Sequence, residues 1–229
     1  MAFRKRSFAL MVALLPVLAT AQTPRRAPQG LPAVVRAIVE GRYDEVATLA
    51  EQLDQRDPTV VALKARALIA RGRYAEAETM LRPAADGAPR SEAALELALL
   101  QQMLGRSDAN SLLAGVAALA DSSNDPGELA RGARALRALG RFQEANAAYR
   151  DAAAAAPNDP AVNTGWGELF LEKYNKADAL KSFQIALKAD PNWMPALLGS
   201  ARTLADENPP QATALAKRAL EINPSSVDV

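Results

Sequence analysis

Two glutamates have the spacing of a general acid and a general base that act together. Glu168 and Glu172 lie four residues apart, which places both on one face of a helix. The same spacing is typical of a solvated helix face, and with Lys173 and Lys176 nearby we favour that interpretation. The chain has no histidine and no cysteine, which removes the usual general base, thiolate chemistry and cysteine zinc sites.

Sequence motifs for catalysis are also missing. No glycine-rich phosphate loop, no HExxH and no GxSxG occurs, so serine or lysine nucleophiles would have no recognisable base. We therefore expect no enzymatic activity, no metal site and no cofactor.

Composition favours helices. Of 229 residues, 49% are hydrophobic and only 5% aromatic, with alanine and leucine prominent. Such a chain can bury a substantial core and favours closely packed helices over a sheet, so we predict an all-α fold. Lys and Arg number 27 against 26 Asp and Glu. This balance provides no overall field for nucleic acid, and we expect no nucleic-acid partner.

The first 21 residues resemble a secretory signal peptide. A basic start (Arg4 to Arg6) precedes an apolar run from Phe8 to Leu18 and a small-residue triplet that ends at Ala21. We predict cleavage between Ala21 and Gln22, a flexible leader over residues 22–30, and a periplasmic or secreted protein. The alternative is a retained membrane anchor. The apolar run is shorter than the roughly 20 residues that a spanning helix needs, so we expect no stable membrane span after cleavage.

A short phrase recurs along the rest of the chain. It begins at a glycine in four copies, and the glycines are 31, 33 and 35 residues apart (Gly41, Gly72, Gly105, Gly140). Two copies without glycine follow at Tyr174 and Asn208, at spacings of 34 and 34. Apolar residues before and after each phrase follow a helical period, and the glycine suits the left-handed end of a helix. Each copy therefore predicts a helical hairpin, and prolines with Asp or Asn beside them separate the hairpins.

These hairpins resemble the tetratricopeptide repeat family, a helix-turn-helix of 34 residues with small residues at the helix crossing. The copy from Pro160 to Trp193 matches best, and the copy from Pro126 to Asp159 nearly as well. The resemblance implies a right-handed α-solenoid of about six repeats over residues 31–226. The approximate repeat bounds are 27–57, 58–90, 91–125, 126–159, 160–193 and 194–226.

Packing between the helices should depend on small residues facing large ones. Small side chains allow the helices to approach, and an aromatic ring fills the gap towards the neighbour. The residues concerned are Ala133, Ala145, Tyr149, Gly167, Ala179 and Phe183. The first and third copies depart from the pattern, with Val46 in place of alanine in the first and no closing proline in the third.

Aromatic residues recur at the repeat spacing and are therefore expected in the core and not in a ligand cage. The set comprises Tyr43, Tyr74, Phe142, Tyr149, Phe170, Tyr174 and Phe183. Trp193 falls between two repeats, where either a packing role or an interface role is open.

The resemblance also implies a binding groove. Members of the family bind a peptide or helix on the concave face, which the first helices line. The corresponding positions here are Arg66, Leu99, Arg134, Glu168 and Arg202, with Arg137 one turn from Arg134. Because several are arginines, one hypothesis is that the groove prefers an acidic partner segment. The alternative is that they are ordinary exposed arginines.

The end of the chain starts a further repeat. The last hairpin closes at residue 226, and residues 227–229 begin another, so we expect an uncapped apolar face that a further repeat or a partner covers. Self-association through this face is one outcome. We expect a protein-interaction scaffold of the bacterial envelope. The alternative is the accessory repeat region of a larger exported enzyme such as a peptidase.

Overall fold

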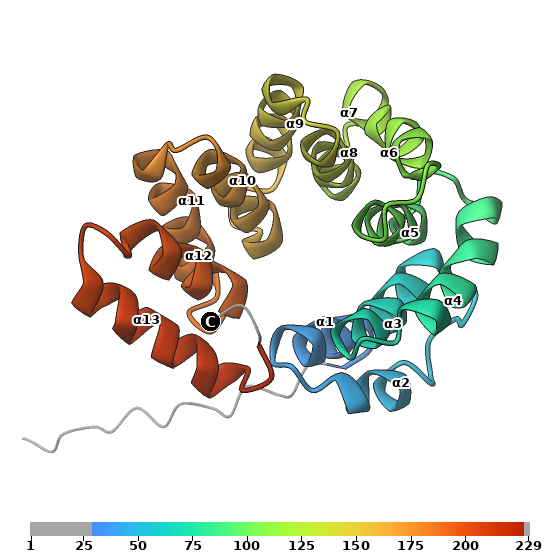
Figure 1. Ribbon diagram of the computed structural model, residues 1–229, viewed down its shortest axis with the longest axis horizontal. Coiled ribbons are helices and arrows are strands. Elements are labelled where there is room, and N and C mark those ends of the chain that lie inside the picture. The colour runs from blue at the N-terminus through green and yellow to red at the C-terminus, as the bar shows by residue number, and fades with distance from the viewer. Residues whose placement is uncertain (1–28, 227–229) are drawn as a thin grey trace, which may run out of the picture.

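The computed structural model describes residues 29–226, and within this range it contains helices and no strand. The predicted signal peptide, its cleavage site between Ala21 and Gln22, most of the leader, and residues 227–229 lie outside the described residues. The helices form six successive hairpins that together make an α-solenoid. In Figure 1 the hairpins follow one another around a ring.

Each hairpin places its first helix on the inner side of the ring and its second helix on the outer side (Figure 1). The inner helices are Leu31–Val39 (α1), Pro58–Ala70 (α3), Glu92–Met103 (α5), Pro126–Ala138 (α8), Pro160–Glu172 (α10) and Met194–Leu204 (α12). The regular outer helices are Tyr74–Gly87 (α4), Phe142–Ala155 (α9), Lys176–Ala189 (α11) and Pro209–Ile222 (α13).

The outer helices of the first and third hairpins are irregular. In the first hairpin a 3-10 turn, Tyr43–Glu45 (η1), leads into a helix of only four residues, Val46–Leu49 (α2). In the third, Ala109–Ala117 (α6) is followed by a short separate helix, Leu119–Ser122 (α7). These are the two copies whose sequences depart from the repeat pattern.

Local chemistry explains where the inner helices begin. The carboxylates of Asp57, Asp125 and Asp159 accept hydrogen bonds from backbone amides in the first turns of α3, α8 and α10, at 2.7 to 2.9 Å. A proline follows each of these caps, and its fixed backbone angle suits the first helical position.

Glycines in the left-handed conformation end four of the inner helices, with φ between 68° and 73° at Gly41, Gly72, Gly105 and Gly140. Tyr174 occupies the same place in the fifth hairpin with φ 57°, and its side chain is 90% exposed. The prediction that Tyr174 is a core aromatic is therefore wrong, because this residue fills the glycine position of the turn. Tyr74 is 39% exposed and also lies outside the core.

Glycines of the inner helices pack against large aromatic rings of the outer helices. A Cβ atom at Gly165 would lie 2.6 Å from Tyr149 Oη, and one at Gly199 would lie 2.4 Å from Phe183 Cζ. Gly167 approaches the same Phe183 ring, where a Cβ would lie 2.6 Å from Cε1. The six residues predicted for packing are all buried. These contacts bring the inner helices α10 and α12 close to the outer helices α9 and α11.

The two ends of the array meet at a contact that we call the seam, formed by Arg36, Gly41, Tyr43, Asp190 and Asn223. Arg36 Nη2 donates to Asp190 Oδ2 at 2.5 Å, and Asn223 Nδ2 lies 3.4 Å from Tyr43 Oη. Asn223 is 0% exposed, although it follows the last helix. The sequence predicted a further repeat or a partner at this end. In the structure the chain's own first hairpin lies against the end of α13 (Figure 1).

The seam differs from the other contacts around the ring in being polar. The four clusters of buried apolar residues join neighbouring hairpins, and none of them joins the first hairpin to the last among the described residues. The ring is therefore closed by an ion pair and a buried amide, without a shared apolar core.

Candidate binding surface on the inner side of the ring

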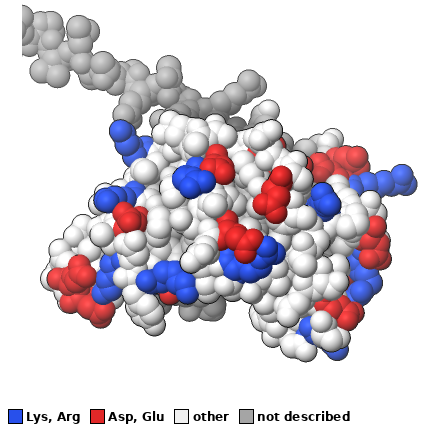
Figure 2. Space-filling model, turned by 90° about the horizontal axis from the view of Figure 1, so that it is seen from above, with Lys and Arg blue, Asp and Glu red and all other residues white. Residues whose placement is uncertain are grey.

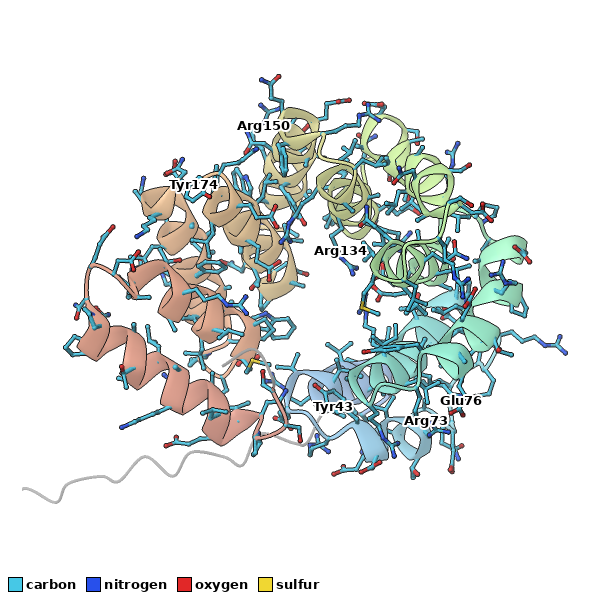
Figure 3. All side chains as sticks on the ribbon, in the orientation of Figure 1. Tyr43, Arg73, Glu76, Arg134, Arg150 and Tyr174 are labelled. Atoms are coloured by element: carbon cyan, nitrogen blue, oxygen red, sulfur yellow. The ribbon has the colours of Figure 1, made fainter. Side chains whose placement is uncertain are left out.

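A network of ion pairs crosses three inner helices. Glu92 and Glu96 of α5 each bind Arg66 of α3 on one side and Arg134 of α8 on the other, and Arg131 Nε donates to Glu92 Oε2 at 3.0 Å. Both Arg66 Nη2 and Arg134 Nη2 lie 2.6 Å from Glu96 Oε1. Figure 3 shows Arg134 pointing from α8 towards the middle of the ring. The network ties the inner edges of the second, third and fourth hairpins together.

The arginines keep both glutamates ionised. Burial would raise the pKa of Glu92, but Arg134, Arg66 and Arg131 outweigh it and lower that pKa to about 2. Burial acts in the same direction on Glu96, and Arg66 and Arg134 again leave its pKa below the usual value. A carboxylate in this state accepts hydrogen bonds and does not serve as a proton donor near neutral pH.

A second group of ion pairs joins α8 to α10. Arg137 Nη1 donates to Glu168 Oε2 at 2.5 Å, and Arg137 Nε donates to Glu172 Oε1 at 2.9 Å. The two carboxylates that are spaced as an acid and base pair thus share one arginine. Both carboxylates are partly exposed, and the lysines near them in the sequence have other contacts. Lys173 lies over the Phe142 ring, and Lys176 binds Asp206 and Glu207.

The two groups balance in charge. They comprise four arginines (Arg66, Arg131, Arg134, Arg137) and four glutamates (Glu92, Glu96, Glu168, Glu172), so their formal sum is 4 − 4 = 0. Positive and negative side chains are also interspersed on the face seen in Figure 2. The hypothesis of an acidic partner loses its physical basis at Arg66, Arg134 and Arg137, because glutamates of the same chain already meet these charges.

Two adjoining cavities open on the inner side. One, of about 380 Å³, is lined by Leu99, Arg134, Arg137, Ala138, Glu168 and Glu172. The other, of about 300 Å³, gathers residues from four hairpins, among them Arg66, Arg134, Tyr149, Thr164, Glu168 and Trp193. Of the predicted groove residues, the structure places Arg66, Leu99, Arg134, Arg137 and Glu168 around these cavities. Arg202, on α12, lines neither. Their role in binding stays a prediction.

Sequence reasoning missed the acidic half of this surface. Glu92 and Glu96 belong to a helix whose other residues are mostly alanine and leucine, and both are largely buried. The available signal was a pair of acidic residues four apart on an otherwise apolar helix, which indicates a buried charge that needs partners.

Three residues that line the second cavity hold buried polar atoms. The Tyr149 hydroxyl lies beside Arg137, and the Thr164 hydroxyl and the Trp193 indole nitrogen make no hydrogen bond within residues 29–226. Burial raises the pKa of Tyr149 to about 12, so its hydroxyl remains protonated. The other tryptophan, Trp166, donates from Nε1 to Asn146 Oδ1 at 2.8 Å.

Other classes of site find no support in residues 29–226. No group of three or more acidic residues there is placed to hold a metal ion. Within the same range, every helix is too short or too polar to cross a bilayer.

One protein-family model matches part of the chain. A family model described as tetratricopeptide repeat matches residues 131–192, which covers most of the fourth and fifth hairpins. No curated protein matches the sequence.

Several solved structures share the fold at low sequence identity. The protein TTC0263 of Thermus thermophilus, a tetratricopeptide repeat protein, is 21% identical over 76% of this chain and 94% of its own, with a TM-score of 0.58. The Cut9-Hcn1 hetero-tetramer of the APC/C is 15% identical over 83% of this chain and 39% of that chain (TM-score 0.56). PilF of Pseudomonas aeruginosa is 22% identical over 74% and 77%, respectively (TM-score 0.50).

Proposed function

We propose that this chain, whose family match and fold support a tetratricopeptide repeat protein, is an interaction scaffold that binds a segment of another protein on the inner side of its ring. The observation that carries the proposal is the pair of adjoining cavities in which side chains from four hairpins converge. A repeat array has no single active centre, and its concave surface is the platform that such folds offer to ligands. One structural neighbour, Cut9, occurs in a hetero-tetramer with Hcn1.

A peptide or a single helix is the partner segment that suits this surface. The lining side chains come from inner helices that lie side by side, so a bound segment would cross several hairpins and contact each of them. Since the arginines and glutamates there already form ion pairs, shape and hydrogen bonding should contribute more to affinity than net charge.

The setting that we propose is the bacterial envelope. It rests on the basic, apolar and small-residue segments that end at Ala21. Expression in a bacterium followed by cell fractionation and N-terminal sequencing tests this setting. A mature chain that begins at Gln22 outside the cytoplasm is expected, and a cytoplasmic chain that begins at Met1 would contradict it.

The scaffold is tested by filling the cavity without disturbing the core. Ala161 is exposed in the first turn of α10 and lines the second cavity, so Ala161→Trp should obstruct it. Ala177→Trp is the matched control, because Ala177 holds the same exposed position in the first turn of α11 on the outer side.

Quantitative capture of partners from an envelope extract compares the two variants. Partners held by the unchanged chain and by Ala177→Trp should be lost by Ala161→Trp. If both variants capture the same proteins in the same amounts, the inner surface is not the binding site. An array that serves a larger exported enzyme would use the same surface, so the comparison applies to that alternative as well.

A further inference from the structure

A tight turn before α12 belongs to both the seam and the inner surface. Asp190 begins this turn, and its Oδ2 accepts the hydrogen bond from Arg36 that closes the seam at 2.5 Å. Trp193 ends the turn and lines the cavity of about 300 Å³. Because only three positions separate Asp190 from Trp193, a displacement at the seam also displaces a wall of the cavity.

Hydrogen bonds hold this turn together as one unit. The Trp193 amide donates to the Asp190 carbonyl oxygen at 3.0 Å, and the Asn192 amide donates to Asp190 Oδ1, also at 3.0 Å. From α13, Arg218 Nη2 donates to the Pro191 carbonyl oxygen at 2.8 Å and to Asn192 Oδ1 at 3.0 Å. The carboxylate that closes the seam therefore also stabilises the turn that carries the tryptophan.

The cavity has walls on both sides of the seam. Arg66 of α3 belongs to the second hairpin, whereas Trp193 and Pro195 lie at the start of the last hairpin. The second hairpin shares an apolar cluster with the first hairpin, which carries Arg36. Apart from the seam, the apolar core of residues 29–226 connects the two walls only the long way round the ring. The width of the cavity therefore depends on whether the seam is closed.

The seam is the contact in the ring that opens most easily. The ion pair of Arg36 and Asp190 is partly exposed, and such pairs contribute little to stability and are screened by salt. The remaining contact is the approach of Asn223 to Tyr43 and Gly41. Without a shared apolar core, the population of the open ring should change severalfold when a single charge is removed.

We propose that the seam regulates the partner surface. The closed ring holds Trp193 against the inner cavity, and loss of the ion pair between Arg36 and Asp190 releases the turn and widens the cavity. A partner segment that contacts Arg66 and Trp193 together is held only by the closed ring, so binding and closure favour each other. The inference rests on the proposed scaffold function and adds a conformational control to it.

The indole N–H group of Trp193 reports the state of the turn. Its nitrogen is buried and makes no hydrogen bond within residues 29–226, so packing alone protects its proton from exchange with water. The only other tryptophan, Trp166, donates to Asn146 between the fourth and fifth hairpins. Hydrogen exchange of both indole protons is followed by NMR on the full chain, after assignment with Trp166→Phe. The Trp166 proton serves as an internal control.

Arg36→Gln removes the ion pair across the seam. Exchange of the Trp193 indole proton should become about two- to fivefold faster, the change in open population expected for one partly exposed ion pair, and exchange at Trp166 should stay the same. Arg42→Gln is the matched control, because Arg42 is also in the first hairpin but pairs with Glu40 and Glu45 of that same hairpin. An unchanged rate at Trp193 in Arg36→Gln, or equal acceleration in both variants, would overturn the proposal.

Ionic strength tests the same ion pair in the unchanged chain. Between 0.01 M and 1 M salt the screening length falls from about 30 Å to about 3 Å. Exchange at Trp193 should accelerate over this range in the unchanged chain and in Arg42→Gln, and much less in Arg36→Gln, which lacks the pair to be screened. The same salt dependence in all three chains would exclude the ion pair as the controlling contact.

The regulation and the scaffold function can fail separately. Arg36→Gln should reduce capture of envelope partners severalfold, and Arg42→Gln should not. If Ala161→Trp abolishes capture and Arg36→Gln leaves it intact, the scaffold is retained and its regulation by the seam is refuted. If Ala161→Trp has no effect on capture, the scaffold function is refuted, and the regulation of partner binding with it.

Discussion

A methyl group at Gly41 should open the ring at its seam. Gly41 has φ 70°, and a Cβ atom there would lie 2.0 Å from Asn223 Oδ1. No non-bonded contact is that short, so the Asn223 side chain would have to leave its position. Asn223 is fully buried, and its amide nitrogen lies 3.4 Å from Tyr43 Oη. Displacement of this residue therefore breaks half of the polar contact that closes the ring.

The size of the effect follows from the contacts. The Arg36 and Asp190 ion pair is partly exposed and contributes about 0.5 to 1 kcal/mol, and the Asn223 hydrogen bond contributes about 1 kcal/mol. Together they favour the closed ring by roughly 2 kcal/mol, or about thirtyfold. A contact at 2.0 Å costs more free energy than these two interactions provide, so Gly41→Ala should open the ring.

The control is Gly72→Ala. Gly72 has φ 73°, and a Cβ there would meet no atom within 4 Å, so this variant bears the same left-handed penalty of about 1 kcal/mol without the collision. The chain has no cysteine, so cysteines introduced at exposed Thr48 and Glu221 can carry spin labels on either side of the seam.

Distances between the two labels decide the question. Gly41→Ala should lengthen and broaden their distribution, and Gly72→Ala should leave it as in the unchanged chain. If the distribution stays short in Gly41→Ala, or broadens equally in both variants, the reasoning about the seam is refuted.

Three other predictions concern stability. Tyr174→Gly should raise the free energy of unfolding in urea by about 1 kcal/mol, because glycine adopts the left-handed conformation without the steric cost of a side chain and the Tyr174 side chain is exposed. A loss of stability would contradict this. Gly199→Ala should lower it by about 1 to 3 kcal/mol through collision with Phe183, and Phe183→Leu should restore part of the loss in the double variant. The pKa of Glu92 is about 2 in the fold against an ordinary 4.5, so the stabilisation that ionised Glu92 provides is complete above about pH 4.5 and declines as the pH falls towards 2. Glu92→Gln should therefore reduce the slope of the unfolding free energy against pH over this range.

The hairpins could be predicted from the sequence because their determinants are local. The Asp and Pro pairs at Asp57, Asp125 and Asp159 cap and start the inner helices within a few residues of themselves. Turn glycines act in the same way. Tyr174 shows the limit of the pattern, because its spacing placed it at a glycine position while its aromatic type suggested the core. Backbone position determined the outcome, and the side chain lies in solvent.

The inner surface could be predicted only in part. A 34-residue period is sufficient to place Arg66, Leu99, Arg134 and Glu168 on the same side of successive hairpins. It does not indicate which charges will meet, because the partners of Arg134 lie 38 and 42 residues away and depend on how closely two hairpins approach. The sequence pattern therefore identified the arginines of the groove but could not predict its net charge.

Closure of the ring depends even less on local sequence. Arg36 and Asp190 are 154 residues apart, and Tyr43 and Asn223 are 180 apart, so both contacts depend on the curvature summed over every interface between the hairpins. That curvature has identifiable causes on the inner side. The ion network draws α3, α5 and α8 together, and Gly165, Gly167 and Gly199 let later inner helices approach aromatic rings. A larger residue at any of these glycines should therefore alter the distance at the seam as well as local stability, which connects core packing with access to the inner cavities.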